Sequence, residues 1–174
     1  MKKVLILIFA AVMITSCDEG KKEKEKVRYS QNSEDINTFK ALISDYEKGN
    51  WDAMKKHYAD TAQIFHNSSK GMKFAEVIDA HKQSLNGLES YQFDADENDY
   101  EMVVTDDGHT WVNFWGNWKG NVTGLDEEVD IPVHLTARFI DGKIVREYGY
   151  WDNAIMMMAM EGMDSTSVAT DSIQ

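Results

Sequence analysis

The stretch ARFIDGKIVREYGYWDN, residues 137–153, decides the fold class of this chain. It predicts a β-hairpin, because Asp141 and Gly142 form a two-residue turn signal between two runs of alternating apolar residues. The same alternation assigns the side chains of Ile144, Tyr148 and Tyr150 to one face of the second strand. That strand is therefore expected to carry aromatic side chains on one face.

A carboxylate, Asp152, follows this strand directly. Strand alternation predicts that it shares the face of Tyr148 and Tyr150, where burial would raise the pKa of the carboxyl group. A group of this kind suits proton abstraction next to a carbonyl. The alternative is a cap at the strand end, with the carboxylate bonded to backbone amides. The sequence leaves both interpretations open.

The length and composition indicate one domain with tails. The chain has 174 residues, of which 43% are hydrophobic and 11% aromatic, enough for an ordinary core. Its formal net charge of -12 would repel a polyanion, so nucleic acid is not expected as a partner.

The N-terminus has the pattern of a secretion signal. Two lysines precede an apolar run over residues 4–14, which is too short to span a bilayer as a helix. The run ends at Ile14-Thr15-Ser16-Cys17, which resembles a bacterial lipobox and contains the only cysteine. We expect residues 1–16 to be a lipoprotein signal peptide and Cys17 to be lipidated, for example with palmitate. The protein would then lie in the bacterial cell envelope and contact a membrane through its lipid anchor only. An ordinary signal peptide with an accidental cysteine is the alternative.

Two polar segments bound the expected domain. Residues 17–32, which begin with Cys17, are dense in charge, and we expect a flexible tether there. Residues 161–174 are rich in Ser, Thr and Asp and are expected to be a disordered tail. The folded domain is predicted over residues 33–160.

Within that domain, helices are expected before strands. Apolar spacing predicts a helix that begins behind Ser33 and ends before Gly49, a short one over residues 51–58, and a third from Phe74 to Gly87. A short strand over residues 62–66 separates the second and third helices, and strands dominate after residue 91. This order predicts an α+β fold with helices on one face of a bent sheet.

Four ordered segments resemble the nuclear transport factor 2-like superfamily, and most closely its SnoaL-like polyketide cyclase and ester cyclase branch. They are residues 46–51 (YEKGNW), 58–62 (YADTA), 139–144 (FIDGKI) and 150–152 (YWD). The resemblance implies a cone, in which a strongly curved antiparallel sheet wraps around three N-terminal helices and leaves a pocket at its open end. Members of the superfamily include isomerases, dehydratases, cyclases, hydrolases and non-enzymatic binding proteins, so the fold alone does not define the function.

The resemblance also suggests site residues. Asp152 matches the acid/base carboxylate of the cyclase branch, and His66 falls where ketosteroid isomerase-like members carry a catalytic aspartate. Their two oxyanion donors would align near Leu42 and Leu135, which are apolar here, so steroid isomerisation is not expected. His81 lies on a helix that often lines the pocket, although a lone histidine on an apolar face is more often a core residue.

The remaining site candidates come from strand patterns. Trp115 shares one strand face with Trp111 and two asparagines, a combination that suits a planar organic ligand or a carbohydrate. His134 should point away from the helices unless Pro132 marks a bulge. Together with catalytic Asp152 and His66, the expected substrate-binding residues are Tyr46, His81, Trp115, Tyr148 and Tyr150. No metal and no cofactor are expected, because the five histidines lack paired ligand spacing.

These patterns favour an envelope lipoprotein that binds a small, largely apolar molecule in a cone pocket, with acid/base chemistry of the cyclase, isomerase or dehydratase type. The alternative is a non-catalytic ligand-binding or protein-interaction domain. A homodimer through the outer sheet face is the expected oligomer.

Overall fold

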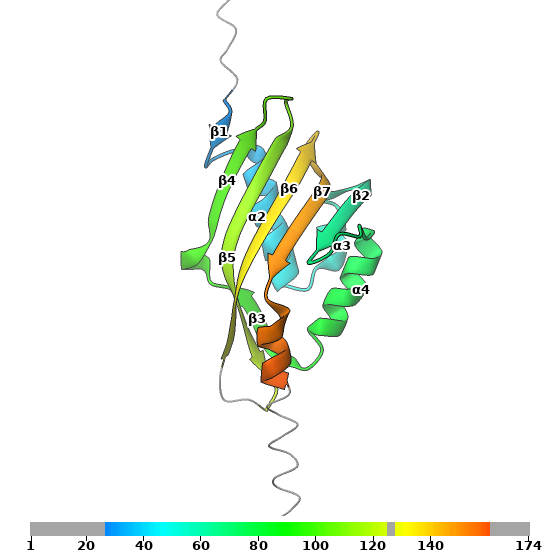
Figure 1. Ribbon diagram of the computed structural model, residues 1–174, viewed down its shortest axis with the longest axis vertical. Helices are drawn as coiled ribbons and strands as arrows, with labels where there is room; N and C mark the ends of the chain where they lie inside the picture. The colour runs from blue at the N-terminus through cyan, green and yellow to red at the C-terminus, as the bar shows by residue number, and fades with distance from the viewer. Residues whose placement is uncertain (1–26, 125–127, 161–174) are drawn as a thin grey trace, which may run out of the picture.

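The computed structural model describes residues 27–124 and 128–160 and shows an α+β fold (Figure 1). One curved, unclosed sheet of seven strands lies across three helices, α2, α3 and α4. The predicted signal peptide, Cys17 and the C-terminal tail lie outside the described residues. The strands are β1 (Tyr29–Ser30), β2 (Tyr58–His66), β3 (Leu88–Phe93), β4 (Asp99–Val104), β5 (Thr110–Val122), β6 (Glu128–Ile140) and β7 (Lys143–Trp151).

The predicted hairpin over residues 137–153 is confirmed. β6 and β7 pair antiparallel on either side of a turn formed by Asp141 and Gly142, whose φ angles are 51° and 70°. Two consecutive positive φ angles are the requirement of a type I′ turn, which matches the twist of the strands it joins. This explains why Asp-Gly was a dependable signal at this position.

The sheet is mixed, so the expectation of an antiparallel sheet was wrong for one strand pair. The strand order is β1-β4-β5-β6-β7-β2, with β3 paired to β5, and β2 runs parallel to β7. β2 comes before α4 in the chain and reaches β7 only through tertiary packing. Hydrophobic alternation within β2 carries no information on the direction of its neighbour.

The helices form largely where the sequence placed them. The helix α2 (Glu34–Glu47) begins behind Ser33, whose hydroxyl accepts a hydrogen bond from the backbone N–H of Ile36 at 3.1 Å. It is followed by α3 (Trp51–Lys55) and α4 (Phe74–Ser84). Tyr58 was expected at the end of the second helix, but it begins β2 instead.

The folded region also begins earlier than Ser33. Tyr29 and Ser30 form β1 and pair with Val103 and Met102 of β4. Residues 27–32 therefore belong to the domain rather than to the predicted tether.

A β-bulge in β7 decides which side chains face the helices. Phe139 is paired with Ile144, but Arg138 is paired with Arg146, so Val145 is an extra residue in β7. Alternation restarts one position later, which turns Glu147 toward the helices and Tyr148 outward.

The core lies between the helices and the concave face of the sheet. Phe39 of α2 is fully buried and lies within 6.5 Å of the ring centroids of Phe114 and Phe139. Below this aromatic cluster the core opens into a cavity, and the residues around that cavity form the candidate site.

Candidate functional site

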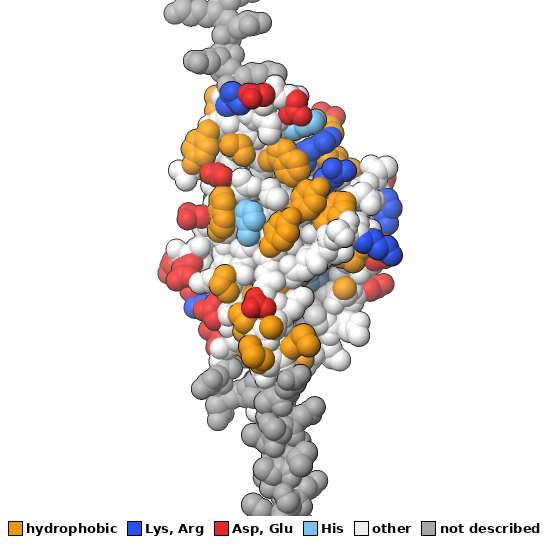
Figure 2. Space-filling model, viewed as in Figure 1, with side chains coloured by type: hydrophobic (Ala, Val, Ile, Leu, Met, Phe, Trp, Pro, Cys, Tyr) orange, Lys and Arg blue, Asp and Glu red, His pale blue; other side chains and the backbone are white. Residues whose placement is uncertain are grey.

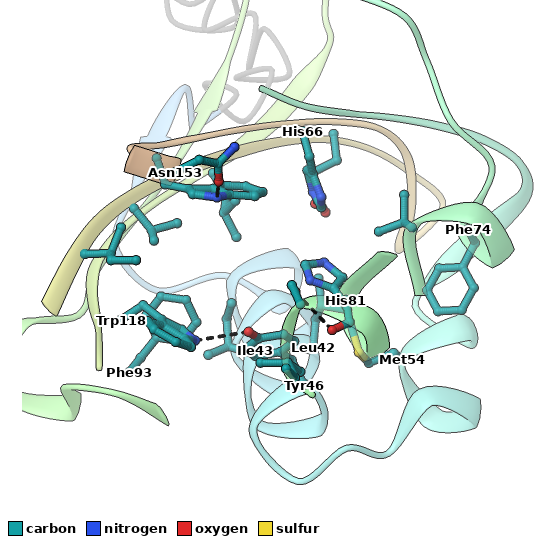
Figure 3. Close-up of a pocket in the computed structure, with 18 of the residues that line it drawn as sticks. Leu42, Ile43, Tyr46, Met54, His66, Phe74, His81, Phe93, Trp118 and Asn153 are labelled. Carbon is teal, nitrogen blue, oxygen red and sulfur yellow. Dashed lines mark hydrogen bonds and ion pairs between the residues drawn. The ribbon is translucent and has the colours of Figure 1, made fainter. Parts of the chain in front are cut away.

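A cavity of about 150 Å³ lies between the concave face of the sheet, α2 and α4 (Figure 3). Most of its wall is apolar, with a few polar side chains converging from different elements. This combination is characteristic of sites for small organic molecules. The polar lining residues are Tyr46, Tyr58, His66, His81, Ser84, Trp118, Glu147 and Asn153.

Glu147 is the only charged side chain among the buried residues of the described chain, with 2% of its surface exposed. The hydroxyl of Tyr58 donates to its Oε2 at 2.6 Å, and Nε2 of His66 lies 2.8 Å from its Oε1. A carboxylate with hydrogen bonds at both oxygens fixes the His66 tautomer: Nε2 carries the proton and donates, which leaves Nδ1 as an acceptor. The two partners of Glu147 come from opposite ends of β2.

Tyr58 keeps its proton in this arrangement. Burial, followed by the nearby Glu147 charge and its hydrogen bond, raises the pKa of the Tyr58 hydroxyl well above its ordinary value. Tyr58 is therefore a permanent hydrogen-bond donor to Glu147.

His81 projects from α4 toward His66 and Tyr46, and its ring centroid lies 5.4 Å from each of theirs (Figure 3). Burial and, to a lesser degree, the neighbouring His66 lower the pKa of His81 to about 4, although the Glu147 charge acts in the opposite direction. At neutral pH the His81 side chain is an uncharged imidazole, able to donate one hydrogen bond and accept another.

Tyr46 presents a hydroxyl on the α2 side of the cavity (Figure 3). The indole Nε1–H of Trp118 donates to this hydroxyl oxygen at 3.0 Å. Since an indole N–H can only donate, this contact uses an acceptor site of Tyr46 and leaves its proton for another partner. Burial also raises the pKa of Tyr46, so the group stays neutral.

Two glycines make room for this site. A Cβ atom on Gly149 would lie within 3.0 Å of side-chain atoms of His66, Trp151 and Leu135, all of which line the cavity. A Cβ on Gly120 would come within 2.3 Å of the Trp118 ring. The missing side chains leave room for the rings of His66 and Trp118 next to the β-strands.

Asp152 lies outside the cavity, and the prediction that it shares an apolar pocket face was wrong. Its side chain is exposed, and its Oδ1 accepts a hydrogen bond from the backbone N–H of Ala154 at 2.8 Å. This is the geometry of a cap on the helix over residues 153–160. The neighbouring Trp151 and Asn153, together with Met156, line the cavity instead.

Three further candidates lie on the outer face of the sheet. Trp115 and Tyr150 are 42% and 52% exposed, and each stacks on His134, at centroid distances of 4.9 and 6.4 Å. Tyr148 stacks on Phe65 at 4.9 Å on the same face. Trp115, Tyr148 and Tyr150 therefore do not line the cavity, and their contact with a ligand stays a prediction. The expectation that His134 points away from the helices is confirmed.

The physical reasons for these placements are local. The Val145 bulge moves Tyr148 and Tyr150 outward. On β5, the amides of Asn113 and Asn117 donate to Glu101 and Glu97 at the solvent-exposed side, so Trp115, which shares their face, points there too.

The cavity brings together three of the predicted residues, His66, His81 and Tyr46, and adds three that the sequence analysis missed. Trp118 was not among the predicted site residues. Tyr58 was placed on a helix, and Glu147 was not considered. The sequence did contain a signal for Glu147. Glu147, Gly149 and Trp151 alternate along one face of the strand, and a glycine inside a strand often marks a β-bulge or a close approach of another group to the backbone.

Within residues 27–124 and 128–160, no group of three His, Cys, Asp or Glu side chains gathers in the manner of a metal site. The absence of a metal remains a prediction. Over the same ranges, no helix has both the length and the apolarity to cross a membrane.

Comparison with solved structures places the fold among nuclear transport factor 2-like and SnoaL-like proteins. IdmH from Streptomyces antibioticus, a proposed polyketide cyclase, aligns with a TM-score of 0.59 at 14% identity, covering 74% of this chain and 99% of IdmH. A proposed SnoaL-like polyketide cyclase from Shewanella denitrificans OS-217 aligns with a TM-score of 0.58 at 14% identity, covering 75% and 99%.

A protein with a ketosteroid isomerase-like fold from Catenulispora acidiphila DSM 44928, solved in complex with trimethylamine, aligns with a TM-score of 0.54 at 12% identity, covering 68% of this chain and 88% of that protein. No protein-family model matches the chain, and no curated protein sequence does. These similarities confirm the predicted cone fold.

Proposed function

We propose that the cone cavity binds a small, largely apolar carbonyl compound and that His66 removes a proton from the carbon next to the carbonyl group. The observation that carries this proposal is the buried Glu147 carboxylate, held between Tyr58 and His66 at the cavity wall. Burying a carboxylate destabilises a protein unless hydrogen bonds satisfy it, so a buried carboxylate at a cavity often has a role in function.

In this scheme the proton moves from the substrate carbon to Nδ1 of His66. The electron pair of the broken C–H bond shifts to the carbonyl oxygen and forms an enolate. Glu147, 2.8 Å from Nε2, stabilises the imidazolium that results and keeps the ring in the required tautomer. Return of the proton to a different carbon would complete an isomerisation, and loss of a leaving group would complete a dehydration.

The enolate oxygen needs a hydrogen-bond donor, and Tyr46 is the best candidate. Its hydroxyl proton is free for a ligand because Trp118 occupies an acceptor site of the oxygen. His81 lies between Tyr46 and His66 and is uncharged at neutral pH, so it is a second possible donor.

The cavity volume limits the substrate. A dry cavity of roughly 150 Å³ is known to accept a molecule of the size of benzene. At about 150 Å³, this cavity suits a single ring with small substituents unless the helix over residues 153–160 moves.

A deuterium-exchange assay tests the proposal. Cyclohexanone and 2-cyclohexenone are incubated with the protein in heavy water, and loss of the α-proton signals is followed by NMR. We expect exchange above buffer, a fall of roughly 10²–10⁴-fold for His66→Gln, and a comparable fall for Glu147→Gln. Asp152→Asn serves as the control and should keep the wild-type rate.

A second candidate function is ligand binding without catalysis. Leu42 and Leu135 line the cavity at the places where the sequence resemblance aligns oxyanion donors, and they offer no hydrogen bonds. If both ketones bind, as seen by shifts of the His66 and His81 NMR signals, but wild type and His66→Gln exchange equally slowly, the binding function is the better account.

We also propose that the domain is held at a membrane of the cell envelope by a lipidated Cys17. The support is the lipobox-like sequence ahead of this cysteine. Radiolabelled palmitate should enter the wild-type protein but not Cys17→Ala. A wild-type protein that takes up no label would remove the anchoring proposal and leave the cavity proposal unaffected.

A further inference from the structure

One end of the outer sheet face carries two arginines that form no ion pair within residues 27–124 and 128–160. The register places six side chains in one line across the strands, from β1 to β2, and we name this line the arginine row. Its members are Tyr29, Val103, Trp111, Arg138, Arg146 and Gln63.

Arg138 and Arg146 lie directly opposite each other on adjacent strands. Like charges in this position destabilise a sheet. The ion pairs found among the described residues include neither arginine, and Nε of Arg138 is buried without a hydrogen-bond partner. The guanidinium of Arg146 lies 5.8 Å from the ring centroid of Phe65. No ion pair among the described residues offsets these two charges, whereas a bound anion would.

Two of the carboxylates near this end are already engaged. In the hairpin between β4 and β5, Asp106 pairs with Arg28 at 2.7 Å and Asp107 pairs with His109 at 2.9 Å. They do not neutralise the arginine row, although the chain as a whole has a formal net charge of -12.

Exposed apolar and aromatic side chains surround the two arginines. Tyr29 is 53% exposed, Ile140 is 47% exposed, and Trp111 is half-buried beside them. Figure 2 shows hydrophobic side chains next to Lys and Arg at this end of the face. Tyrosine and tryptophan are enriched where proteins meet the headgroup layer of a bilayer, and arginine binds phosphate in a bidentate manner.

The chain also enters the fold at this row, because β1 is the first element and Tyr29 is a member of the row. Val27, the first described residue, lies ten positions after Cys17, and ten residues span at most about 35 Å. A lipid at Cys17 would therefore keep the row within reach of the bilayer surface.

We propose that the arginine row docks on the phosphate headgroups of the membrane in which the protein is anchored. This inference rests on the proposed lipidation of Cys17. Docking would fix the orientation of the domain, with the outer face at its β1 end against the bilayer. A second copy of the chain fits this surface less well than a membrane does. In a dimer with its two-fold axis along the strands, the arginine rows of the two copies would face each other, and their guanidinium groups would repel.

Fluorescence quenching tests the docking. The full lipidated chain is reconstituted into vesicles of equal parts phosphatidylethanolamine and phosphatidylglycerol, with or without bromine atoms on the acyl chains. Brominated lipid should quench the tryptophan emission, and Trp111→Phe should remove much of the quenched component. Arg138→Gln with Arg146→Gln should reduce the quenching to roughly half or less. Lys55→Gln with Lys82→Gln, on α3 and α4, makes the same charge change and should leave it intact.

Three results would overturn the inference, and they are distinguishable. A lipidated, vesicle-bound protein without quenching would remove the docking but keep the anchor. A chain that takes up no palmitate would remove the anchor and the docking together. A lipid-free dimer that the double arginine variant converts to monomers would assign the row to a second copy.

Discussion

A carboxyl group with 2% exposure needs hydrogen bonds in place of water, and Glu147 obtains both of its partners from β2. Tyr58 supplies a neutral donor, and His66 supplies a donor that can also carry charge. This division explains how a single buried carboxylate can stabilise the fold and orient a base.

Removing the Tyr58 hydroxyl should therefore destabilise the protein. Tyr58→Phe leaves Oε2 of Glu147 without its partner, which should cost about 1–3 kcal/mol of unfolding free energy, measured by urea denaturation. Tyr150→Phe removes a hydroxyl from an exposed ring and should change the stability by less than about 0.5 kcal/mol. Equal losses in the two variants would show that the bond to Glu147 contributes nothing.

His81 should make the stability depend on pH. Its pKa is lowered from 6.5 to about 4 in the folded state, so the unfolded chain binds more protons between these values. Stability from this group is complete above about pH 6.5 and falls as the pH drops toward 4, by on the order of 3 kcal/mol. Thermal denaturation across this range should show a shallower decline for His81→Gln. A parallel decline in both proteins would contradict the assignment.

Helical spacing placed Tyr46 and His81 on apolar helix faces, and the family resemblance pointed to His66. Glu147 was not predicted as a site residue, because charged residues are rarely buried and regular strand alternation placed its side chain on the solvent face. Only tertiary packing reveals that Tyr58 and His66 satisfy it.

At the scale of elements, one extra residue in β7 exchanges the side chains that face the cavity with those that face outward. The hairpin, its turn and the helix start at Ser33 follow from local chemistry, so the sequence predicted them correctly. The bulge at Val145 and the parallel pairing of β2 depend on neighbouring strands and were not predictable from alternation.

The end of β7 provides a test at this scale. Asp152 caps the helix over residues 153–160, so Asp152→Ala should lower the stability by about 1 kcal/mol in thermal denaturation. Asp152→Asn preserves the cap and should leave the stability almost unchanged. If Asp152→Asn kept full stability but lost the deuterium exchange, Asp152 would again be the candidate acid/base group.

At the scale of the whole molecule, the cone separates two aromatic surfaces. The concave side holds the cavity, and the convex side carries a half-exposed group formed by Trp115, His134 and Tyr150 (Figure 2). The overall architecture was the most predictable property of the chain, because it follows from the order of helices and strands together with a family resemblance.

The homodimer expected from the sequence remains a prediction and would use this convex group, which the register places four residues along β5 from the arginine row. Sedimentation equilibrium should show a dimer, and Trp115→Glu with Tyr150→Glu should weaken it by at least about tenfold, since exposed aromatic anchors dominate interfaces. The helix-side variant Lys55→Gln should have no effect. A wild-type protein that stays monomeric at all concentrations would contradict the prediction.

The central claim is that Glu147 holds His66 as a base facing the cavity, and nitrogen-15 NMR of the histidine side chains tests it most directly. The account predicts a His66 whose Nε2 proton is donated to Glu147, an Nδ1 that is left to accept a proton, and a change in the Nδ1 signal when 2-cyclohexenone is added. Glu147→Gln should abolish the preference for this tautomer. A His66 that carries its proton on Nδ1, or whose signals do not respond to any ketone, would contradict the account.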